Sequence, residues 1–371
     1  MLCSDLTFGG IQKIALTIAG ELAKKNGLSV DLAVLHGKGE FLSMVSPAVN
    51  LVCLDCTSQP LALLFPFSKL ARYFRMERPD VVLSFGHSTN CLAACAKLLR
   101  HFPFRLIVSE RNSFGTRMAE DAKFRQWRRI ATTRFLYRQA ESCVCVSQGV
   151  ADELIDLKVV TKEKIRVIYN PVSAPLPADN DNRLLNNPWL RGGDEKCPPV
   201  ILSAGRLVKQ KGLDTLIRAF ARLRLEMGID ARLIIFGEGP ERQNLEKLAQ
   251  ALNIKGDVCF AGYVPNPCAY MEKSAVVTLS SHHEGFGNVL LEALACGVNV
   301  VSTDCKSGPR EILEDGKWGW LVPVGDDEAF AAALKEALTA PFSAEVLKKR
   351  AEYFSIERFV EAYYKTLLGE L

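Results

Sequence analysis

Short apolar and β-branched runs alternate along this chain with segments of helical periodicity, and the alternation occurs twice. The first series of expected strands is Ser29–Leu35, Val49–Leu54, Asp80–Phe85, Arg105–Ser109, Ser142–Ser147 and Ile165–Ile168. Helical periodicity is found between them, for example at Ile11–Lys25, Phe67–Glu77 and Ala119–Arg138. The pattern predicts βαβ units with parallel sheets, because parallel neighbours need a long crossover connection.

Residues 173–199 interrupt this pattern, since they are rich in Pro, Asn, Asp and Gly and are typical of a linker with a surface loop. A second series of expected strands follows at Val200–Ala204, Ala231–Phe236, Val258–Ala261, Ala275–Leu279, Val298–Ser302 and Gly319–Val322. The helices expected among them are Leu213–Met227, Glu241–Leu252, Asn288–Ala295 and Glu328–Leu338.

We therefore predict an α/β fold of two Rossmann-like, doubly wound domains that face each other across a cleft, and 371 residues suit two such cores. The predicted N-terminal domain is residues 1–172 and the second is residues 200–355. A last amphipathic helix at 356–371 can pack on either domain, including back on the N-terminal one. The first strand, within Met1–Ser4, is shorter than the usual length of about five or six residues. We therefore expect a few residues to precede it.

Composition excludes several classes of protein. With 48% apolar and 24% charged residues, the chain is neither disordered nor fibrous. The 12 cysteines are scattered through apolar stretches, so we expect buried, reduced thiols and no metal site. Neither a signal peptide nor an apolar run of about 18 residues occurs. These features predict a cytoplasmic protein, which can also lie on the inner face of the cytoplasmic membrane.

The net charge of +4 is too small to indicate a nucleic-acid partner, but it is unevenly distributed. Residues 1–172 carry +8 and the remainder carries −4. Residues 123–138, KFRQWRRIATTRFLYR, contain six cations, no acid and several aromatic residues. A helix of this composition can bind an anionic membrane or a lipid pyrophosphate. The alternative is a core helix with a solvated basic face.

The second domain contains an acidic, glycine-rich motif, Glu284-Gly285-Phe286-Gly287-Asn288, followed by Glu292. Glycines allow the backbone to approach a ligand closely, and the free N–H groups where a helix begins at Asn288 favour an anion. The motif therefore predicts a phosphate near two carboxylates. The alternative is an ordinary loop and helix with two solvated acids.

A basic loop follows the strand Val200–Ala204 and reads Gly205-Arg206-Leu207-Val208-Lys209-Gln210-Lys211-Gly212. Arg206 and Lys211 are expected at the carboxyl end of that strand. A guanidinium fork and an ammonium group can together neutralise a leaving diphosphate.

Four segments resemble, in their order along the chain, the family 4 glycosyltransferases, which have the GT-B fold. They are GRLVKQKG (205–212), FGEGPE (236–241), FAGYV (260–264) and EGFGNVLLEALACG (284–297). The resemblance implies a retaining transferase that needs neither metal nor cofactor. It implies a nucleotide-sugar donor, expected to be a UDP-sugar carrying a hexose or N-acetylhexosamine. The acceptor is expected to be a glycan or a lipid-linked glycan in polysaccharide, lipopolysaccharide or glycoprotein-glycan assembly.

The resemblance also assigns roles to single residues. The diphosphate would be bound by Arg206 and Lys211, the sugar ring by Glu284 and the ribose hydroxyls by Glu292. Donor contacts are likewise implied for the backbone at Gly10, Gly205, Val264, Gly287 and Asn288, with Val264 meeting the base and Gly10 approaching the phosphates.

The acceptor side departs from the family pattern. Many members have a His after the strand that corresponds to Arg105–Ser109, whereas this chain continues with Glu110, Arg111 and Asn112. These three residues, together with His87 at the end of a neighbouring strand, are therefore our candidates for the acceptor site. A structural role for His87 is the alternative.

His282 and His283 are adjacent and would point to opposite faces of a strand, so we expect them to line the cleft and not to bind a metal. A donor-binding scaffold with weak or no catalysis remains the alternative to an enzyme. A dinucleotide enzyme is disfavoured, because no G-x-G-x-x-G motif follows the first strand.

Overall fold

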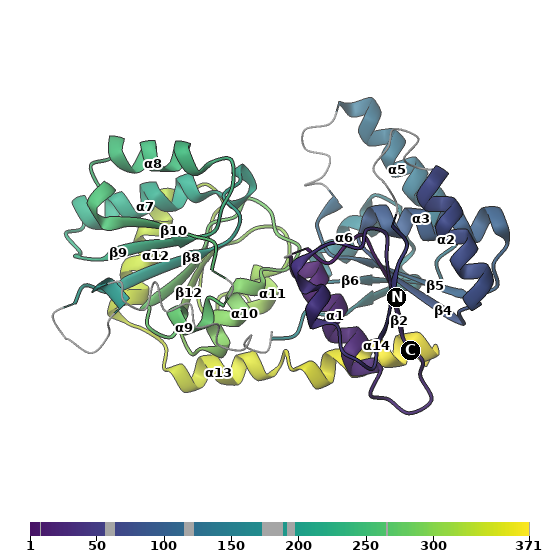
Figure 1. Ribbon diagram of the computed structural model, residues 1–371. Coiled ribbons are helices and arrows are strands. Elements are labelled where there is room, and N and C mark those ends of the chain that lie inside the picture. The colour runs from purple at the N-terminus through teal and green to yellow at the C-terminus, as the bar shows by residue number, and fades with distance from the viewer. Residues whose placement is uncertain are drawn as a thin grey trace. The chain divides into compact units, whose positions relative to one another are not determined.

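The computed structural model describes residues 1–7, 9–55, 64–114, 122–172, 188–190, 197–264 and 266–370. Most of the predicted linker, 173–199, therefore lies outside the described residues. The chain divides into two compact units (Figure 1). The N-terminal unit combines Met1–Asn170 with Glu357–Leu371, and the C-terminal unit is Pro171–Ile356.

The N-terminal unit is built on a seven-stranded parallel sheet with the order β3-β2-β1-β4-β5-β6-β7. Its strands are β1 (Leu2–Cys3), β2 (Asp31–Val34), β3 (Asn50–Cys53), β4 (Val81–Phe85), β5 (Arg105–Glu110), β6 (Ser142–Cys145) and β7 (Ile165–Val167). Its helices are α1 (Gly10–Leu22), α2 (Leu64–Glu77), α3 (His87–Arg100), α5 (Lys123–Tyr137), α6 (Gln148–Asp156) and α14 (Ile356–Leu368).

The C-terminal unit is built on a six-stranded parallel sheet with the order β10-β9-β8-β11-β12-β13. Its strands are β8 (Val200–Ala204), β9 (Arg232–Phe236), β10 (Val258–Gly262), β11 (Val276–Leu279), β12 (Asn299–Thr303) and β13 (Trp320–Val322). Its helices are α7 (Leu213–Leu225), α8 (Arg242–Ala251), α9 (Cys268–Met271), α10 (Asn288–Ala295), α11 (Pro309–Ile312), α12 (Asp327–Thr339) and α13 (Ala344–Glu352).

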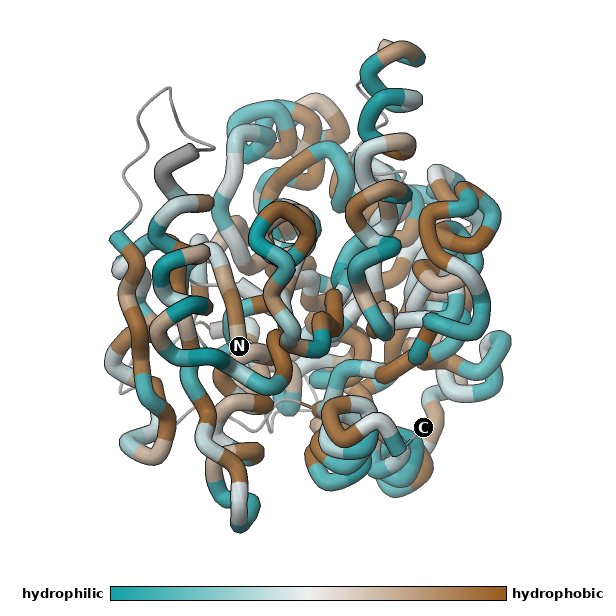
Figure 2. Tube along the Cα trace, turned by 90° about the vertical axis from the view of Figure 1, so that its right-hand side faces the viewer, coloured by the Kyte–Doolittle hydropathy of each residue, from teal (hydrophilic) through white to brown (hydrophobic). Residues whose placement is uncertain are grey.

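Both sheets are doubly wound, with helices on both faces, which confirms the predicted α/β class. Strands buried on two sides are mainly apolar, as the fully buried Leu233, Ile234 and Ile235 of β9 illustrate. The outer helices are amphipathic, and Figure 2 shows hydrophobic and hydrophilic residues alternating along them. Burial of the apolar stripes against the sheets holds each unit together.

The sequence did not predict several of the helices, notably α3, α6 and α13. The crossover from β4 to the parallel neighbour β5 requires α3, yet its sequence His87–Arg100 is rich in small residues and lacks a clear apolar stripe. Its buried face is formed by Thr89, Asn90 and three alanines. Such a face is not distinguished by hydrophobic periodicity alone.

Strand order reverses once in each sheet. In the N-terminal unit the chain winds outwards from β1 to β3 and then continues from β4 on the other side of β1; in the C-terminal unit the same happens between β8 and β11. Loops diverge at such a switch point and leave a crevice at the carboxyl ends of the strands, where ligands bind in open α/β sheets. The two switch points are therefore the candidate ligand sites of the two units.

Candidate active site

The switch point of the C-terminal sheet brings together the two motifs that the sequence singled out. Arg206 and Lys211 lie on the loop after β8, and Glu284 lies on the loop after the neighbouring strand β11. Lys211 ends a 3₁₀ turn, Lys209–Lys211, and is followed by the left-handed Gly212. Residues 73 positions apart are thus in contact because β8 and β11 are paired side by side.

Lys211 and Glu284 form the central contact of this crevice. The Nζ atom of Lys211 lies 2.6 Å from Oε1 of Glu284, and both side chains are largely enclosed, with 21% and 11% exposed. The hydroxyl of Ser281 donates to the same Oε1 at 2.6 Å. The carboxylate is therefore held by a cation and a neutral donor, which together fix its direction.

The two loops are also joined through their backbones. Ser280 Oγ donates to the carbonyl of Lys211 at 2.8 Å, and the N–H of His282 donates to the carbonyl of Gln210 at 2.8 Å. The amide of Gln210 donates to the carbonyl of His283 at 2.8 Å. His282 and His283 thus contribute their backbone to the loop contact. This network positions Lys211 and Glu284 relative to each other.

Gly212 shows why glycine is needed beside the pair. Its φ is +55°, and a Cβ at this position would lie 2.2 Å from the carbonyl oxygen of Ser280. Both the left-handed conformation and the lack of space therefore exclude a larger residue.

Arg206 and Gly205 lie on the same loop as Lys211. The Arg206 side chain is exposed, and Gly205 is packed against Lys211, whose Cε would be 3.4 Å from a Cβ at position 205. Val264, predicted near the base, follows β10 and is half-buried. The strand β10 is the outermost strand of the sheet, two strands away from β8. Val264 and Lys211 are therefore on separate loops, both at the carboxyl ends of the strands.

The helix α10 begins at Asn288, as predicted, and carries Glu292 one turn later on a half-buried position. Its N-cap is Gly287, whose φ of +101° is in the left-handed region. The N-terminus of α10 has no side-chain cap. An uncapped helix N-terminus beside a cationic loop suits an anion.

Three residues of this crevice were missed by the sequence analysis. Ser281 binds the Glu284 carboxylate, and Ser307 Oγ donates to the Glu284 carbonyl at 2.6 Å. Burial, followed by the nearby Glu284 charge, raises the pKa of the Cys305 thiol to about 12, so the thiol stays protonated at neutral pH. Ser281 and Ser307 carry no distinctive motif, and only their position after strands β11 and β12 would have drawn attention to them.

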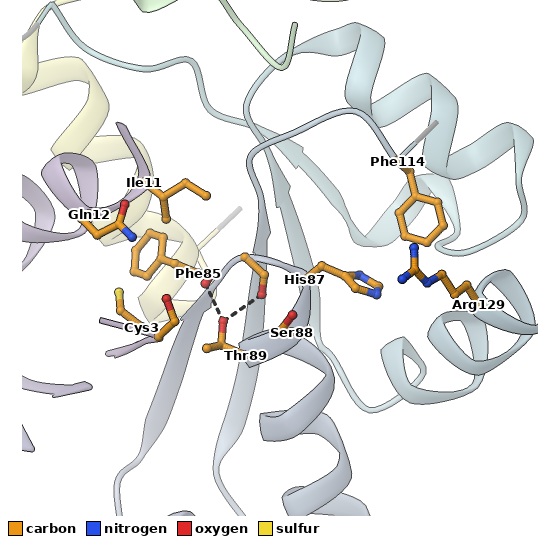
Figure 3. Close-up of a pocket in the computed structure, with 11 residues that line it drawn as sticks. Cys3, Ile11, Gln12, Phe85, His87, Ser88, Thr89, Phe114 and Arg129 are labelled. Atoms are coloured by element: carbon orange, nitrogen blue, oxygen red, sulfur yellow. Dashed lines mark hydrogen bonds between the residues drawn. The ribbon is translucent and has the colours of Figure 1, made fainter. Parts of the chain in front are cut away.

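The switch point of the N-terminal sheet contains a pocket of about 320 Å³ (Figure 3). It is lined by the ends of β1 and β4, the first turns of α1 and α3, Phe114 and Arg129. His87, a predicted acceptor residue, is among the lining residues. Gly10, predicted to approach the donor phosphates, is exposed and opens α1, which supplies Ile11 and Gln12 to the pocket.

The other predicted acceptor residues are placed differently. Glu110 is 1% exposed and lies behind His87, with its Oε1 3.4 Å from the imidazole Nδ1. Arg111 is buried, and its guanidinium donates to the side chain of Asn170 and to the hydroxyl of Tyr363. Asn112 is exposed. The structure therefore brings His87 and Glu110 together but directs Arg111 into the protein interior.

In the part of the chain that the structure describes, no group of three or more His, Cys, Asp or Glu side chains is arranged to hold a metal ion. No helix in that part is both long and apolar enough to cross a membrane.

Comparison with known proteins assigns both units. The family model for glycosyltransferase family 4 matches residues 8–174, and that for the glycosyl transferases group 1 matches residues 192–354. The lipopolysaccharide core biosynthesis glycosyltransferase LpsE of Rhizobium meliloti is 31% identical over 307 residues, which are 81% of this chain and 79% of that protein.

A second relative is similar over nearly its whole length. This Campylobacter jejuni protein is an N-acetylgalactosamine-N,N'-diacetylbacillosaminyl-diphospho-undecaprenol 4-alpha-N-acetylgalactosaminyltransferase, 28% identical over 98% of both chains. Among solved structures, Anabaena HepE in complex with UDP-glucose has the same fold, with a TM-score of 0.79 and 18% identity over 100% of this chain and 98% of that one. The chain therefore belongs to the family 4 glycosyltransferases and has the GT-B fold.

Proposed function

We propose that the protein is a retaining glycosyltransferase that moves a hexose or N-acetylhexosamine from a UDP-sugar to a glycan or lipid-linked acceptor in cell-surface glycan assembly. The observation that carries this proposal is the Lys211–Glu284 pair at the switch point of the C-terminal sheet, with Arg206 on the same loop. A fixed cation beside a fixed carboxylate can bind the diphosphate and the sugar of one donor molecule.

On this proposal, Lys211 and Arg206 bind the donor diphosphate and stabilise the charge that develops on it as the glycosidic bond breaks. Glu284 accepts hydrogen bonds from the sugar hydroxyls, and Glu292 does the same for the ribose. Gly205, Gly287, Asn288 and the backbone at Val264 complete the donor site. These cationic groups take the part that a metal ion has in other transferases, so the reaction is expected to need no metal or other cofactor.

The reaction then requires no protein nucleophile. The acceptor hydroxyl oxygen bonds to the anomeric carbon on the face from which the diphosphate departs, and the departing phosphate oxygen takes the hydroxyl proton. The protein aligns the two reactants and stabilises the leaving group.

The relatives support the choice of donor and acceptor. HepE was crystallised with UDP and with UDP-glucose, and the Campylobacter jejuni relative acts on a sugar linked to diphospho-undecaprenol. LpsE is named for lipopolysaccharide core biosynthesis. A UDP-sugar and an acceptor of a cell-surface glycan are therefore the first substrates to test.

The test is UDP release from UDP-glucose, UDP-galactose and their N-acetyl forms, with and without acceptors, in the presence of EDTA. We expect turnover that Arg206→Ala and Glu284→Ala abolish, whereas Arg218→Ala, an exposed arginine on α7, leaves it unchanged. The product should keep the α configuration of the donor by ¹H NMR. Tight UDP-sugar binding without turnover on any acceptor would instead indicate a donor-binding scaffold.

We also propose that α5 binds the anionic inner face of the cytoplasmic membrane. Phe124 and Trp127 are 70% and 65% exposed, and their rings stack with centroids 6.3 Å apart. Exposed aromatic rings among Arg125 and Arg128 are typical of helices that lie in a membrane interface.

Vesicle co-sedimentation tests this second proposal. Phe124→Ala with Trp127→Ala, and separately Arg125→Glu with Arg128→Glu, should each lower binding to vesicles that contain phosphatidylglycerol. The matched control is Met76→Ala, which removes a 65% exposed apolar side chain from α2. Equal sedimentation of all these variants would exclude α5 as the membrane-binding element.

A further inference from the structure

Arg350 lies on α13, which packs against α10 (Figure 1), and its side chain reaches the end of α11. That side chain is only 12% exposed. Its Nε donates to the carbonyl of Ile312 at 2.9 Å, and one terminal nitrogen donates to the carbonyl of Glu311 at 2.8 Å. The last carbonyls of a helix have no partner within the helix, and a guanidinium fork suits two neighbouring acceptors. Arg350 thus fixes the C-terminal end of α11.

The segment at the start of α11 is packed against the loop of Glu284. Ser307 Oγ donates to the carbonyl of Glu284 at 2.6 Å. Gly308 is so close to the backbone of Phe286 that a Cβ at position 308 would overlap the Phe286 carbonyl group. Because α11 has only four residues, a shift of its end also moves Ser307 and Gly308. The first route from Arg350 to the loop of Glu284 therefore runs through α11.

The second route runs through an aromatic ring. The guanidinium of Arg350 lies 5.0 Å from the centroid of the Phe354 ring, which is a cation–π distance. The Phe354 ring in turn meets the Phe286 ring edge to face, with centroids 5.9 Å apart, and both residues are 3% exposed. The backbone of Phe354 is fixed as well, because its carbonyl accepts the N–H of Val172 at 2.8 Å. Phe286 is two residues from Glu284, so this ring contact supports the same loop.

The loop of Glu284 depends on such supports for a fixed shape. Glycines precede and follow Phe286, and the second of them, Gly287, has a φ of +101°. Glycine has the largest conformational freedom of all residues. The contact of Lys211 with the Glu284 carboxylate is a further support. If Lys211 binds the diphosphate, this support weakens when the donor is bound, and the contacts made through Arg350 then become the more important ones.

We propose that Arg350 is a positioning residue of the donor site, which holds the loop of Glu284 through α11 and Phe354 and thereby aligns the Glu284 carboxylate with the donor sugar. A misplacement of about 1 Å can cost about 100-fold in rate. The contacts of Arg350 lead to the loop of Glu284, so binding of the sugar, and not of the diphosphate, should depend on it. The assignment of the sugar to Glu284 rests on the proposed function, whereas the support of the loop by Arg350 does not.

The first measurement needs no donor. Hydrogen exchange of the full-length protein, followed by mass spectrometry, reports how often a segment of backbone opens. We expect Arg350→Gln to speed exchange in peptides that cover 284–296 and 307–316 about 10-fold or more, because charge-assisted hydrogen bonds are lost. Peptides that cover 205–212 should be nearly unchanged. Lys349→Gln is the matched control, since Lys349 is the neighbouring, exposed cation on α13.

The second measurement tests the alignment with the sugar. Isothermal titration without acceptor gives the dissociation constants of UDP and of UDP-glucose, UDP-galactose and their N-acetyl forms. We expect Arg350→Gln to weaken binding of the donor UDP-sugar about 10-fold or more, as for a lost charge-assisted hydrogen bond, and to leave UDP binding nearly unchanged. Lys349→Gln should change neither. Arg350→Lys, which keeps the cation but not the fork, should give an intermediate loss.

A double-mutant cycle shows whether Arg350 acts through the Glu284 carboxylate. Glu284→Gln already lacks that carboxylate, so adding Arg350→Gln should have little further effect on binding of the UDP-sugar. Two residues that act through one group are not additive. A purely structural role of Arg350 would instead give the same loss in both backgrounds.

Three outcomes would overturn the proposal. The first is an Arg350→Gln protein whose exchange in 284–296 matches that of Lys349→Gln. The second is a UDP-sugar affinity that Arg350→Gln changes no more than the UDP affinity, and the third is an equal loss with and without Glu284→Gln. If Arg350→Gln does not fold, Arg350→Lys is used for the same measurements. Failure of the proposed function is distinguishable, because the natural protein would then bind none of the UDP-sugars, whereas the exchange difference would persist.

Discussion

The ammonium group of Lys211 lies 2.6 Å from a carboxylate oxygen of Glu284, across two loops that follow the paired strands β8 and β11. Each group therefore satisfies the other. If Lys211 binds the diphosphate and Glu284 binds the sugar, then the two substitutions must affect UDP differently, because UDP carries the diphosphate without the sugar.

We expect Lys211→Met to weaken UDP binding about 10-fold or more, since a charge-assisted hydrogen bond contributes about 1.5–3 kcal/mol. Glu284→Gln should leave UDP binding equal to or tighter than that of the natural protein, because it releases Lys211 from its carboxylate. Turnover of the UDP-sugar should fall in both. Isothermal titration with UDP, together with UDP-release kinetics, checks both expectations.

Lys209→Ala is the matched control, since Lys209 is an exposed lysine of the same 3₁₀ turn. If Glu284→Gln weakened UDP binding as much as Lys211→Met, the carboxylate would serve only to hold the lysine.

The conformation of Gly212 leads to a prediction about stability. Gly212→Ala combines a left-handed φ with a Cβ 2.2 Å from the Ser280 carbonyl oxygen. We expect a loss of more than about 2 kcal/mol in the free energy of unfolding, with impaired UDP binding because the Lys211 loop must move. Gly256→Ala is the control: no atom lies within 4 Å of its added Cβ, and urea unfolding should show little change.

Tyr363 anchors the C-terminal helix to β5. Its hydroxyl lies 3.3 Å from both Ser109 Oγ and the Arg111 guanidinium, and the residue is fully buried. Tyr363→Phe keeps the ring packing but removes both contacts, so we expect a loss of about 1–2 kcal/mol in the free energy of unfolding. Tyr364→Phe, the neighbouring and less buried position, should change stability by less than about 0.5 kcal/mol. Equal effects at both positions would contradict the anchoring role.

The pair of Arg105 and Glu141 predicts a dependence on acid. Hydrogen bonds from Arg105, with distances of 2.5–3.1 Å, lower the pKa of Glu141 below its ordinary value of 4.5. The folded state therefore binds the proton of Glu141 less tightly than the unfolded state. The pair stabilises the fold above about pH 4.5, and this contribution is lost as the pH falls through the lowered pKa.

The free energies of unfolding of the natural protein and of Glu141→Gln, measured with urea, should accordingly differ at pH 6 and become equal toward pH 3. The difference will be small, because both side chains are partly exposed. A difference between the two free energies of unfolding that increases as the pH falls would contradict this account.

The alternating strands and helices, the break at 173–199 and the order of the motifs were enough to predict two doubly wound domains and the family. Local chemistry explains this success, because β-branched runs and amphipathic periods are properties of short segments. The same reasoning did not predict α3, whose buried face consists of small residues. It did not predict the roles of Ser281 and Ser307 either, because their hydrogen bonds to Glu284 depend on the strands that their loops follow.

The partners of individual side chains were decided by tertiary structure. Strand order put the loop of Lys211 beside that of Glu284, and it put Glu110 behind His87 instead of at the surface. The last helix could have packed on either domain by its sequence, and the bonds of Tyr363 to Ser109 and Arg111 assign it to the N-terminal unit. Such contacts join residues far apart in the chain, so no local pattern encodes them; they follow from which strands are neighbours in the sheet.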